Sequence, residues 1–155
     1  MKVLIADKFE QSGIDASRLF GHQPVFDQIR RRSFMVAPKR IIDSAFNSAH
    51  SGSAIRRPYT TLPQFFDAID KSMHDAAGPT FTYAYWPELD RLAHEHGIGS
   101  NQVAIHLEEL DAAFDYFVDS VRGRDSIVIV TGDHGFIDTT PDAMIDLDAH
   151  PTLAE

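Results

Sequence analysis

The feature that most constrains the fold is a long helical pattern followed at once by a continuous apolar run. Between residues 101 and 122, apolar side chains recur at steps of four and three, from Val103 to Val121. This spacing is typical of a helix with one buried face, and Gly123 is placed to end it. Residues 126–131, Ser-Ile-Val-Ile-Val-Thr, have the composition of a strand buried on both faces in a parallel sheet. Together they predict one α-to-β unit of a layered α/β fold.

Shorter segments repeat this alternation of strands and helices. The helical stripe that begins at Leu62 and ends at Met73 predicts a helix, which Gly78-Pro79 separates from an aromatic, β-branched strand. In full, we predict strands at 3–6, 34–37 and 80–86 and helices at 24–32 and 61–76.

The composition fits a single packed domain and excludes several kinds of partner. The 155 residues are 43% hydrophobic and carry a formal net charge of −9, which argues against nucleic acid polymers and anionic membranes as partners. The absence of cysteine excludes disulfides, thiolate metal sites and cysteine nucleophiles within these residues. No apolar run approaches the roughly 18 residues of a membrane span, and the opening residues do not form a signal sequence. We therefore expect a cytoplasmic chain.

Asp133 and His134 stand directly after the apolar run, between Gly132 and Gly135. In open α/β sheets, ligands gather at the carboxyl ends of strands, where this turn is expected. A carboxylate beside an imidazole offers oxygen and nitrogen donors that suit Zn²⁺ or Mn²⁺. The simpler interpretation is a polar turn capped by Asp133, and this segment alone leaves both open.

Asp90 and His94 form a second pair, which follows the predicted strand 80–86. One helical turn would place both side chains on the same face, although a solvated first turn is the simpler interpretation of this segment. Two Asp/His pairs at two strand ends indicate two metal ions held side by side, as in phosphoryl transfer. We expect the strands 80–86 and 126–131 to be adjacent or nearly so, parallel, and crossed over by the long helix.

Three stretches, in this order, resemble the alkaline phosphatase superfamily: TYAYWPELDRLAHEHGIGS, LEELDAAFDYFVDSV and SIVIVTGDHGFID. The resemblance is closest to its type I phosphodiesterase/nucleotide pyrophosphatase branch. Order and spacing match over about residues 80–140, and more weakly over residues 23–59. Ala93 and Phe136 stand where relatives often have Gly and Met, which are small changes beside the expected ligands.

The resemblance implies a three-layer α/β/α domain with a mostly parallel sheet, of which residues 1–155 form a single partial domain, the middle portion. It further implies a metal-dependent phosphodiesterase or phosphatase that acts on a small phosphate ester with two divalent ions, Zn²⁺ or else Mn²⁺. By the same resemblance, Asp90 and His94 are ligands of one ion, and Asp133 and His134 are ligands of the other.

The family's early Asp ligand, its Thr or Ser nucleophile and its later His ligand have no counterpart in these residues. We therefore expect an inactive part of a larger hydrolase domain, whose remaining part is its partner. Ser44, Thr60 and Thr61 do not match the setting of the nucleophile, and His150 is interpreted as a non-ligand. Sulfatases and cofactor-independent phosphoglycerate mutases share the metal scaffold and are alternatives. An alternative of another class is a non-catalytic α/β module that binds a metal ion or a partner chain.

Overall fold

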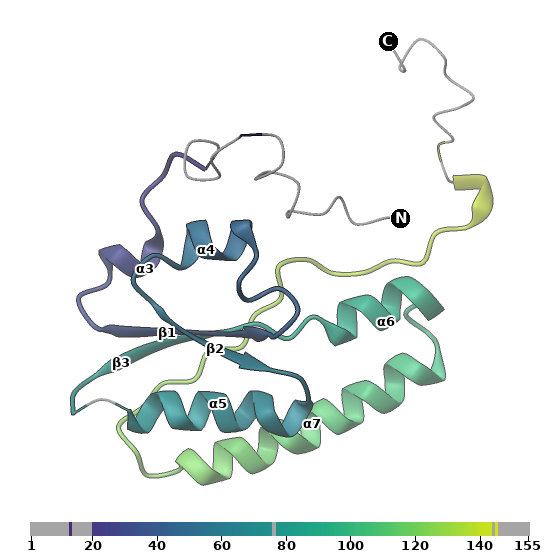
Figure 1. Cartoon of the computed structure of the whole chain (residues 1–155). Coiled ribbons are helices and arrows are strands. Elements are labelled where there is room, and N and C mark those ends of the chain that lie inside the picture. The colour runs from purple at the N-terminus through teal and green to yellow at the C-terminus, as the bar shows by residue number, and fades with distance from the viewer. Residues whose placement is uncertain (1–12, 14–19, 76, 144, 146–155) are drawn as a thin grey trace.

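Strands and helices alternate along the chain in the computed structural model, which describes residue 13 and residues 20–75, 77–143 and 145 (Figure 1). None of the helices in this part of the chain combines the length and apolarity that a bilayer span requires. The elements are, in order, α3 (Val25–Gln28), β1 (Arg32–Pro38), α4 (Ala45–Ser51), β2 (Ile55–Tyr59), α5 (Leu62–His74), β3 (Thr80–Ala84), α6 (Glu88–His96), α7 (Asn101–Val121) and a 3-10 helix (Pro141–Ala143).

The three strands form one parallel sheet in the order β2-β1-β3. In the central strand, Phe34 is in register with Ile55 of β2 and Thr82 of β3. Phe34 and Val36 are fully buried, as expected for a strand covered on both faces. The parallel sheet confirms the predicted α/β class, and the strand predicted at 34–37 forms the buried part of β1.

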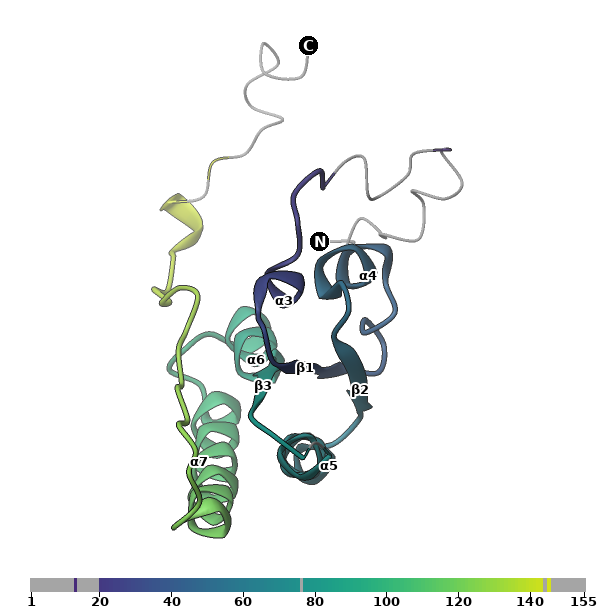
Figure 2. The same ribbon diagram turned by 90° about the vertical axis from the view of Figure 1, so that its left-hand side faces the viewer.

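Helices cover both faces of this sheet, so that the molecule has three layers (Figure 2). α3 and α4 lie over one face, and α5 lies over the other. Successive side chains of a strand point to opposite faces. Met35 and Ala37 of β1 therefore pack with Phe26 of α3, whereas Val36 packs with Phe65 of α5. Two small cores thus lie back to back, in the α/β/α arrangement that the resemblance implied.

The two longest predicted helices form within two residues of their predicted ends. The Thr61 hydroxyl accepts a backbone hydrogen bond at the start of α5, and the Ser100 hydroxyl does the same for α7. Such caps satisfy amide groups that have no partner inside the helix. Gly123 lies just beyond α7 with a φ of 81°, a left-handed value that favours glycine. Local sequence patterns therefore determine these helices.

Aromatic side chains join the end of β2 to the segment that follows β3. The Tyr59 hydroxyl donates a hydrogen bond to the carbonyl oxygen of Tyr85 (2.6 Å), and the Tyr59 ring stacks on Trp86 at a centroid distance of 5.3 Å. Trp86 Nε1 in turn donates to His106 Nε2 of α7 (3.0 Å). Trp86 is therefore part of the packing between layers. Tyr85, by contrast, is exposed.

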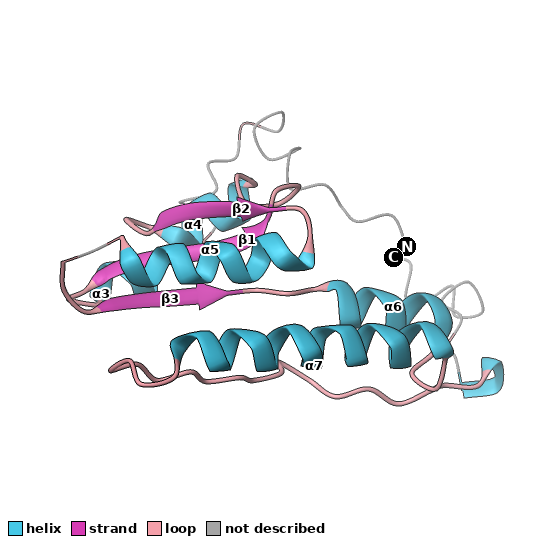
Figure 3. Ribbon diagram, turned by 90° about the horizontal axis from the view of Figure 1, so that it is seen from below, coloured by secondary structure: helices cyan, strands magenta, loops and turns pink. Residues whose placement is uncertain are grey.

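Two predicted elements are wrong. Residues 126–131 form no strand: they pair with no described strand, and Ile127 and Ile129 are 89% and 82% exposed. Apolar composition alone does not supply the neighbouring strand that a buried strand requires, and Figures 2 and 3 show this segment running back beside α7 instead. The expected pairing of two adjacent parallel strands is therefore absent from the described structure. The helix predicted at 24–32 is only the four-residue α3, because the chain enters β1 at Arg32.

β2 and α4 were not predicted. The sequence of β2, Ile-Arg-Arg-Pro-Tyr, has neither the alternation nor the apolar content typical of a strand. α4 has only seven residues and begins at the Ser44 cap. The strand predicted at residues 3–6 lies outside the described residues.

Candidate metal centre

Helix α6 carries the first predicted pair of ligands. It begins at Glu88, and its 3.6-residue repeat places Asp90 and His94 one turn apart. Asp90 Oδ1 lies 3.4 Å from His94 Nε2. The helix ends before Gly97, whose φ of 82° favours glycine. α6 therefore presents a carboxylate and an imidazole side by side, as the spacing predicted.

The second predicted pair lies in the segment that follows α7. His134 Nε2 is 3.7 Å from Asp90 Oδ1 and 3.8 Å from Asp133 Oδ1. The backbone N–H of His134 also donates a hydrogen bond to Asp133 Oδ1 (3.1 Å), which orients the Asp133 side chain. Asp90 thus lies close to the imidazoles of both His94 and His134. The two pairs meet, although residues 126–131 do not form the second strand that was expected to bring them together.

The Phe136 ring lies against both histidines. Its centroid is 5.1 Å from that of His134 and 5.9 Å from that of His94, with the planes nearly perpendicular in both cases. Such edge-to-face contacts favour a defined ring geometry. In the sequence, Phe136 stood out only as a departure from the family pattern, so its contact with both histidines was missed. Its place two residues after His134 was the available signal.

Tyrosine side chains at the end of β3 lie within the electrostatic field of the same carboxylates. Burial raises the pKa of the Tyr83 hydroxyl, and the charge of Asp133 raises it further. Burial also raises the pKa of the Tyr85 hydroxyl, and the charges of Asp90 and Asp133 raise it further. Negative charge therefore gathers at the carboxyl end of β3, where a cation would be stabilised.

The donor set fits a divalent cation in chemistry but not in number. Asp90 Oδ1 is buried and has no hydrogen-bond partner, so a cation beside it would satisfy an otherwise costly group. Carboxylate oxygen and imidazole nitrogen are ligands that Zn²⁺ and Mn²⁺ accept. Among the described residues, however, no three His, Asp or Glu side chains come together in an arrangement that could hold a metal ion. Catalytic zinc sites typically use about three protein ligands, so neither pair is sufficient by itself.

The three hydroxyl side chains considered as nucleophiles have structural contacts. Ser44 and Thr61 cap α4 and α5, and the Thr60 hydroxyl donates to Gln64 Oε1 (2.6 Å). Their positions give no support for a nucleophile among them. His150 lies outside the described residues.

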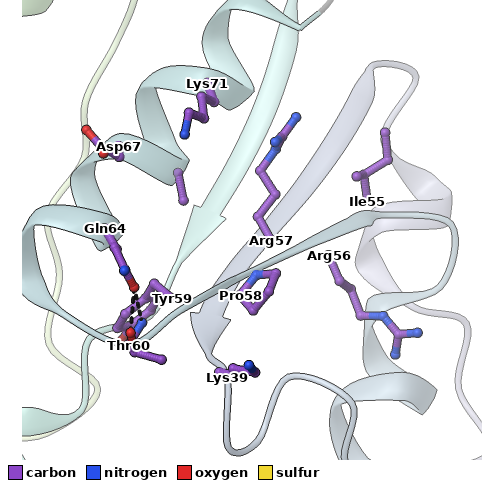
Figure 4. A pocket seen from close by; sticks show the side chains of 11 residues that line it. Lys39, Ile55, Arg56, Arg57, Pro58, Tyr59, Thr60, Gln64, Asp67 and Lys71 are labelled. Atoms are coloured by element: carbon purple, nitrogen blue, oxygen red, sulfur yellow. Dashed lines mark hydrogen bonds between the residues drawn. The ribbon is translucent and has the colours of Figure 1, made fainter.

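A hollow of about 620 Å³ lies elsewhere, between β2 and α5 (Figure 4). It is lined mainly by basic and neutral side chains, with Asp67 as the one acidic lining residue. Figure 4 shows Arg56 and Arg57 leaving β2 in opposite directions, and Arg57 forms an ion pair with Asp75 outside the hollow. These cations would repel a metal ion, so the hollow is not part of the candidate centre.

Comparison with known proteins gives one result. The family model of type I phosphodiesterase / nucleotide pyrophosphatase matches residues 6–154. No curated protein and no solved structure matches the chain. The match covers both Asp/His pairs, the long helix between them and the whole parallel sheet. The chain therefore belongs to the type I phosphodiesterase / nucleotide pyrophosphatase family, a family of phosphoester hydrolases, as its resemblance to the alkaline phosphatase superfamily indicated.

Proposed function

We propose that these residues form part of a two-metal-ion hydrolase of small phosphate esters, in which Asp90 and His94 bind one ion and Asp133 and His134 bind the other. The observation that carries this proposal is the buried oxygen of Asp90. It has no hydrogen-bond partner, yet it lies beside the imidazoles of His94 and His134. Family membership and the surrounding carboxylates support the same conclusion.

In this proposal, the side chains of this chain bind the metal ions and hold them in position. Asp90 and Asp133 supply negative charge, and the two histidines supply neutral nitrogen donors. The Phe136 ring lies edge-to-face against both histidines and favours a defined orientation of their imidazoles. Two divalent ions, when bound, supply Lewis-acid stabilisation of the charge on the phosphate oxygens. Further ligands and the nucleophile come, in this proposal, from the rest of the domain.

For the 155 residues by themselves, we propose weak ion binding without turnover. This is favoured by the absence of any three convergent ligands among the described residues. Calorimetric titration with Zn²⁺ or Mn²⁺ tests it. We expect dissociation constants above about 1 µM, because an incomplete set of ligands leaves coordination positions to water. Asp90→Ala and His134→Ala should each weaken binding further.

Helix α5 provides a matched control. Asp70 and His74 are also four residues apart, with His74 Nδ1 3.4 Å from Asp70 Oδ2, and the Arg124 guanidinium lies beside both of them, where it disfavours a metal ion. Asp70→Ala and His74→Ala should leave ion binding unchanged. Tight binding that survives both Asp133→Ala and His134→Ala would contradict the assignment. Turnover of a chromogenic phosphodiester that disappears in Asp90→Ala would show that the chain is catalytically complete.

A further inference from the structure

The segment that carries Asp133 and His134 is joined to the rest of the chain by few contacts. Among the residues that the structure describes, one hydrogen bond links residues 127–139 to the remainder: the backbone N–H of Ile98 donates to Asp138 Oδ1 (3.1 Å). All other described hydrogen bonds of this segment are between its own residues. Asp138 therefore accepts the one described hydrogen bond between the rest of the chain and a segment that is exposed along most of its length.

The turn after α6 is built so that the Ile98 amide is available. Gly97 ends the helix, and its own N–H bonds back to the carbonyl oxygen of Ala93 (2.9 Å). Its φ of 82° turns the chain sharply, so that the next amide points out of the helix. A Cβ at position 97 would lie 3.5 Å from Asp138 Oδ1, so this glycine and this carboxylate are in direct proximity.

We infer that Asp138 is a positioning residue for the candidate metal centre, through its hydrogen bond to Ile98. This inference rests on the proposed function. Asp138 lies four residues after His134, and Ile98 lies four residues after His94. The hydrogen bond therefore joins the two ligand-bearing segments at equal distances along the chain from their histidines. It holds residues 133–136 against α6, where the Phe136 ring contacts both imidazoles.

The energetic reason is preorganisation. Without this hydrogen bond, residues 133–136 would sample positions in which His134 is remote from Asp90. Ion binding would then have to order the segment, and the affinity would fall with the fraction of molecules in the competent arrangement. A carboxylate acceptor is suited to this role, because a hydrogen bond to a charged group is stronger than one between neutral groups.

Asp138→Ala, Asp138→Asn and Asp125→Ala in the full chain test this inference. The Asn side-chain oxygen can still accept the Ile98 N–H. Asp125 is an exposed carboxylate just before the same segment, for which the structure records no hydrogen bond or ion pair, so its removal controls for the loss of charge. The measurements are hydrogen exchange of the Ile98 amide and nuclear Overhauser effects between the Phe136 and His94 rings, both without metal, and calorimetric affinity for Mn²⁺.

We expect Asp138→Ala to speed Ile98 exchange about tenfold or more, to remove the ring-to-ring signal, and to weaken Mn²⁺ binding by about 10- to 100-fold. Asp138→Asn should stay within about threefold of the wild type in both exchange and affinity, and Asp125→Ala should match the wild type. Wild-type affinity in Asp138→Ala overturns the inference, as does unchanged Ile98 exchange. If the wild-type chain binds no ion, the proposed function fails. The positioning of residues 133–136 is then decided by the two metal-free measurements, and an intact ring-to-ring signal in Asp138→Ala overturns it.

Discussion

The two edges of the sheet differ in whether another strand could pair with them. On β2, the Lys39 amide donates to the Tyr59 carbonyl oxygen, so the backbone N–H and C=O groups of Tyr59 point toward β1. The backbone polar groups of the alternate residues Arg56, Pro58 and Thr60 therefore point outward. Pro58 has no N–H, and the Thr60 N–H is already bonded to Gln64 Oε1 (2.9 Å). Proline and charge are common means of protecting an edge strand. The β2 edge is therefore closed to further pairing.

The outer edge of β3 lacks such protection. The Tyr85 amide donates to the Val36 carbonyl oxygen, so the backbone N–H and C=O groups of Thr80, Thr82 and Ala84 point outward. None of these three residues is a proline or carries a charge. The Thr82 hydroxyl is buried and has no hydrogen-bond partner. An apolar segment, with Ile127, Ile129 and Val130 highly exposed, lies on this side of the sheet (Figure 2).

The difference indicates that a further strand could pair with β3 but not with β2. Asp90 and His94 follow β3, and Asp133 and His134 follow the exposed apolar segment. The candidate ligands thus belong to the open edge, whereas the basic hollow belongs to the closed one. A strand added beside β3 would also lie beside the candidate metal centre. The edge with unpaired backbone groups is thus the same edge that carries the candidate ligands.

The largest expected effect comes from Trp86, which connects the two edges through Tyr59. Trp86→Ala should lower the free energy of unfolding by about 3 kcal/mol, because it leaves a cavity among stacked rings. Trp86→Phe keeps a ring but loses the N–H that His106 accepts, and should cost about 1 kcal/mol. Urea unfolding followed by circular dichroism measures both. A loss below about 1 kcal/mol for Trp86→Ala would show that the two edges are stabilised independently.

Intermediate effects are expected for one polar side chain near each edge. Thr82→Val removes a hydroxyl that has no partner, so it should be neutral or stabilise the fold by up to about 1 kcal/mol. Gln64→Ala leaves the Thr60 N–H and hydroxyl to water, and should destabilise the fold by about 0.5–1 kcal/mol. The same urea measurements compare them. A clear loss of stability in Thr82→Val would mean that its hydroxyl is hydrogen-bonded in solution.

The smallest effect on stability is expected at Ile129. Because this side chain is 82% exposed, Ile129→Lys should change the free energy of unfolding by less than about 0.5 kcal/mol. It should nevertheless reduce self-association, since exposed apolar segments beside an open strand edge favour it. Sedimentation velocity over a range of concentrations measures this. Ile105→Lys on α7, also an exposed isoleucine, is the control and should have less effect. Equal effects at both positions would show that the exposed segment beside β3 promotes self-association no more than α7 does.

Local patterns in the sequence predicted the parts of the fold that local interactions determine. The long helix was predicted from its periodicity and from Gly123, which is placed to end it, and α6 was anticipated by the spacing of Asp90 and His94. β2 could not be found in this way, because its strand conformation comes from pairing with β1 rather than from its own residues. Residues 126–131 failed in the opposite sense, since their composition is typical of a strand but no described strand pairs with them.

The candidate centre shows the same limit. The residue types and their positions after strands or apolar runs were sufficient to single out two Asp/His pairs, because metal ligands have a restricted chemistry. The hydrogen bond from Ile98 to Asp138 joins residues forty positions apart, and no local pattern marks an aspartate as the acceptor of a distant backbone amide. Contacts of this kind depend on the tertiary structure alone.

The contact between Trp86 and His106 also provides an intrinsic fluorescence signal for the packing of α7. Trp86 is its only tryptophan, so intrinsic indole fluorescence has a single origin. The ring is nearly parallel to the imidazole of His106, which accepts the indole N–H and belongs to α7. Emission intensity and wavelength should therefore follow the separation of α7 from the sheet, without any added label.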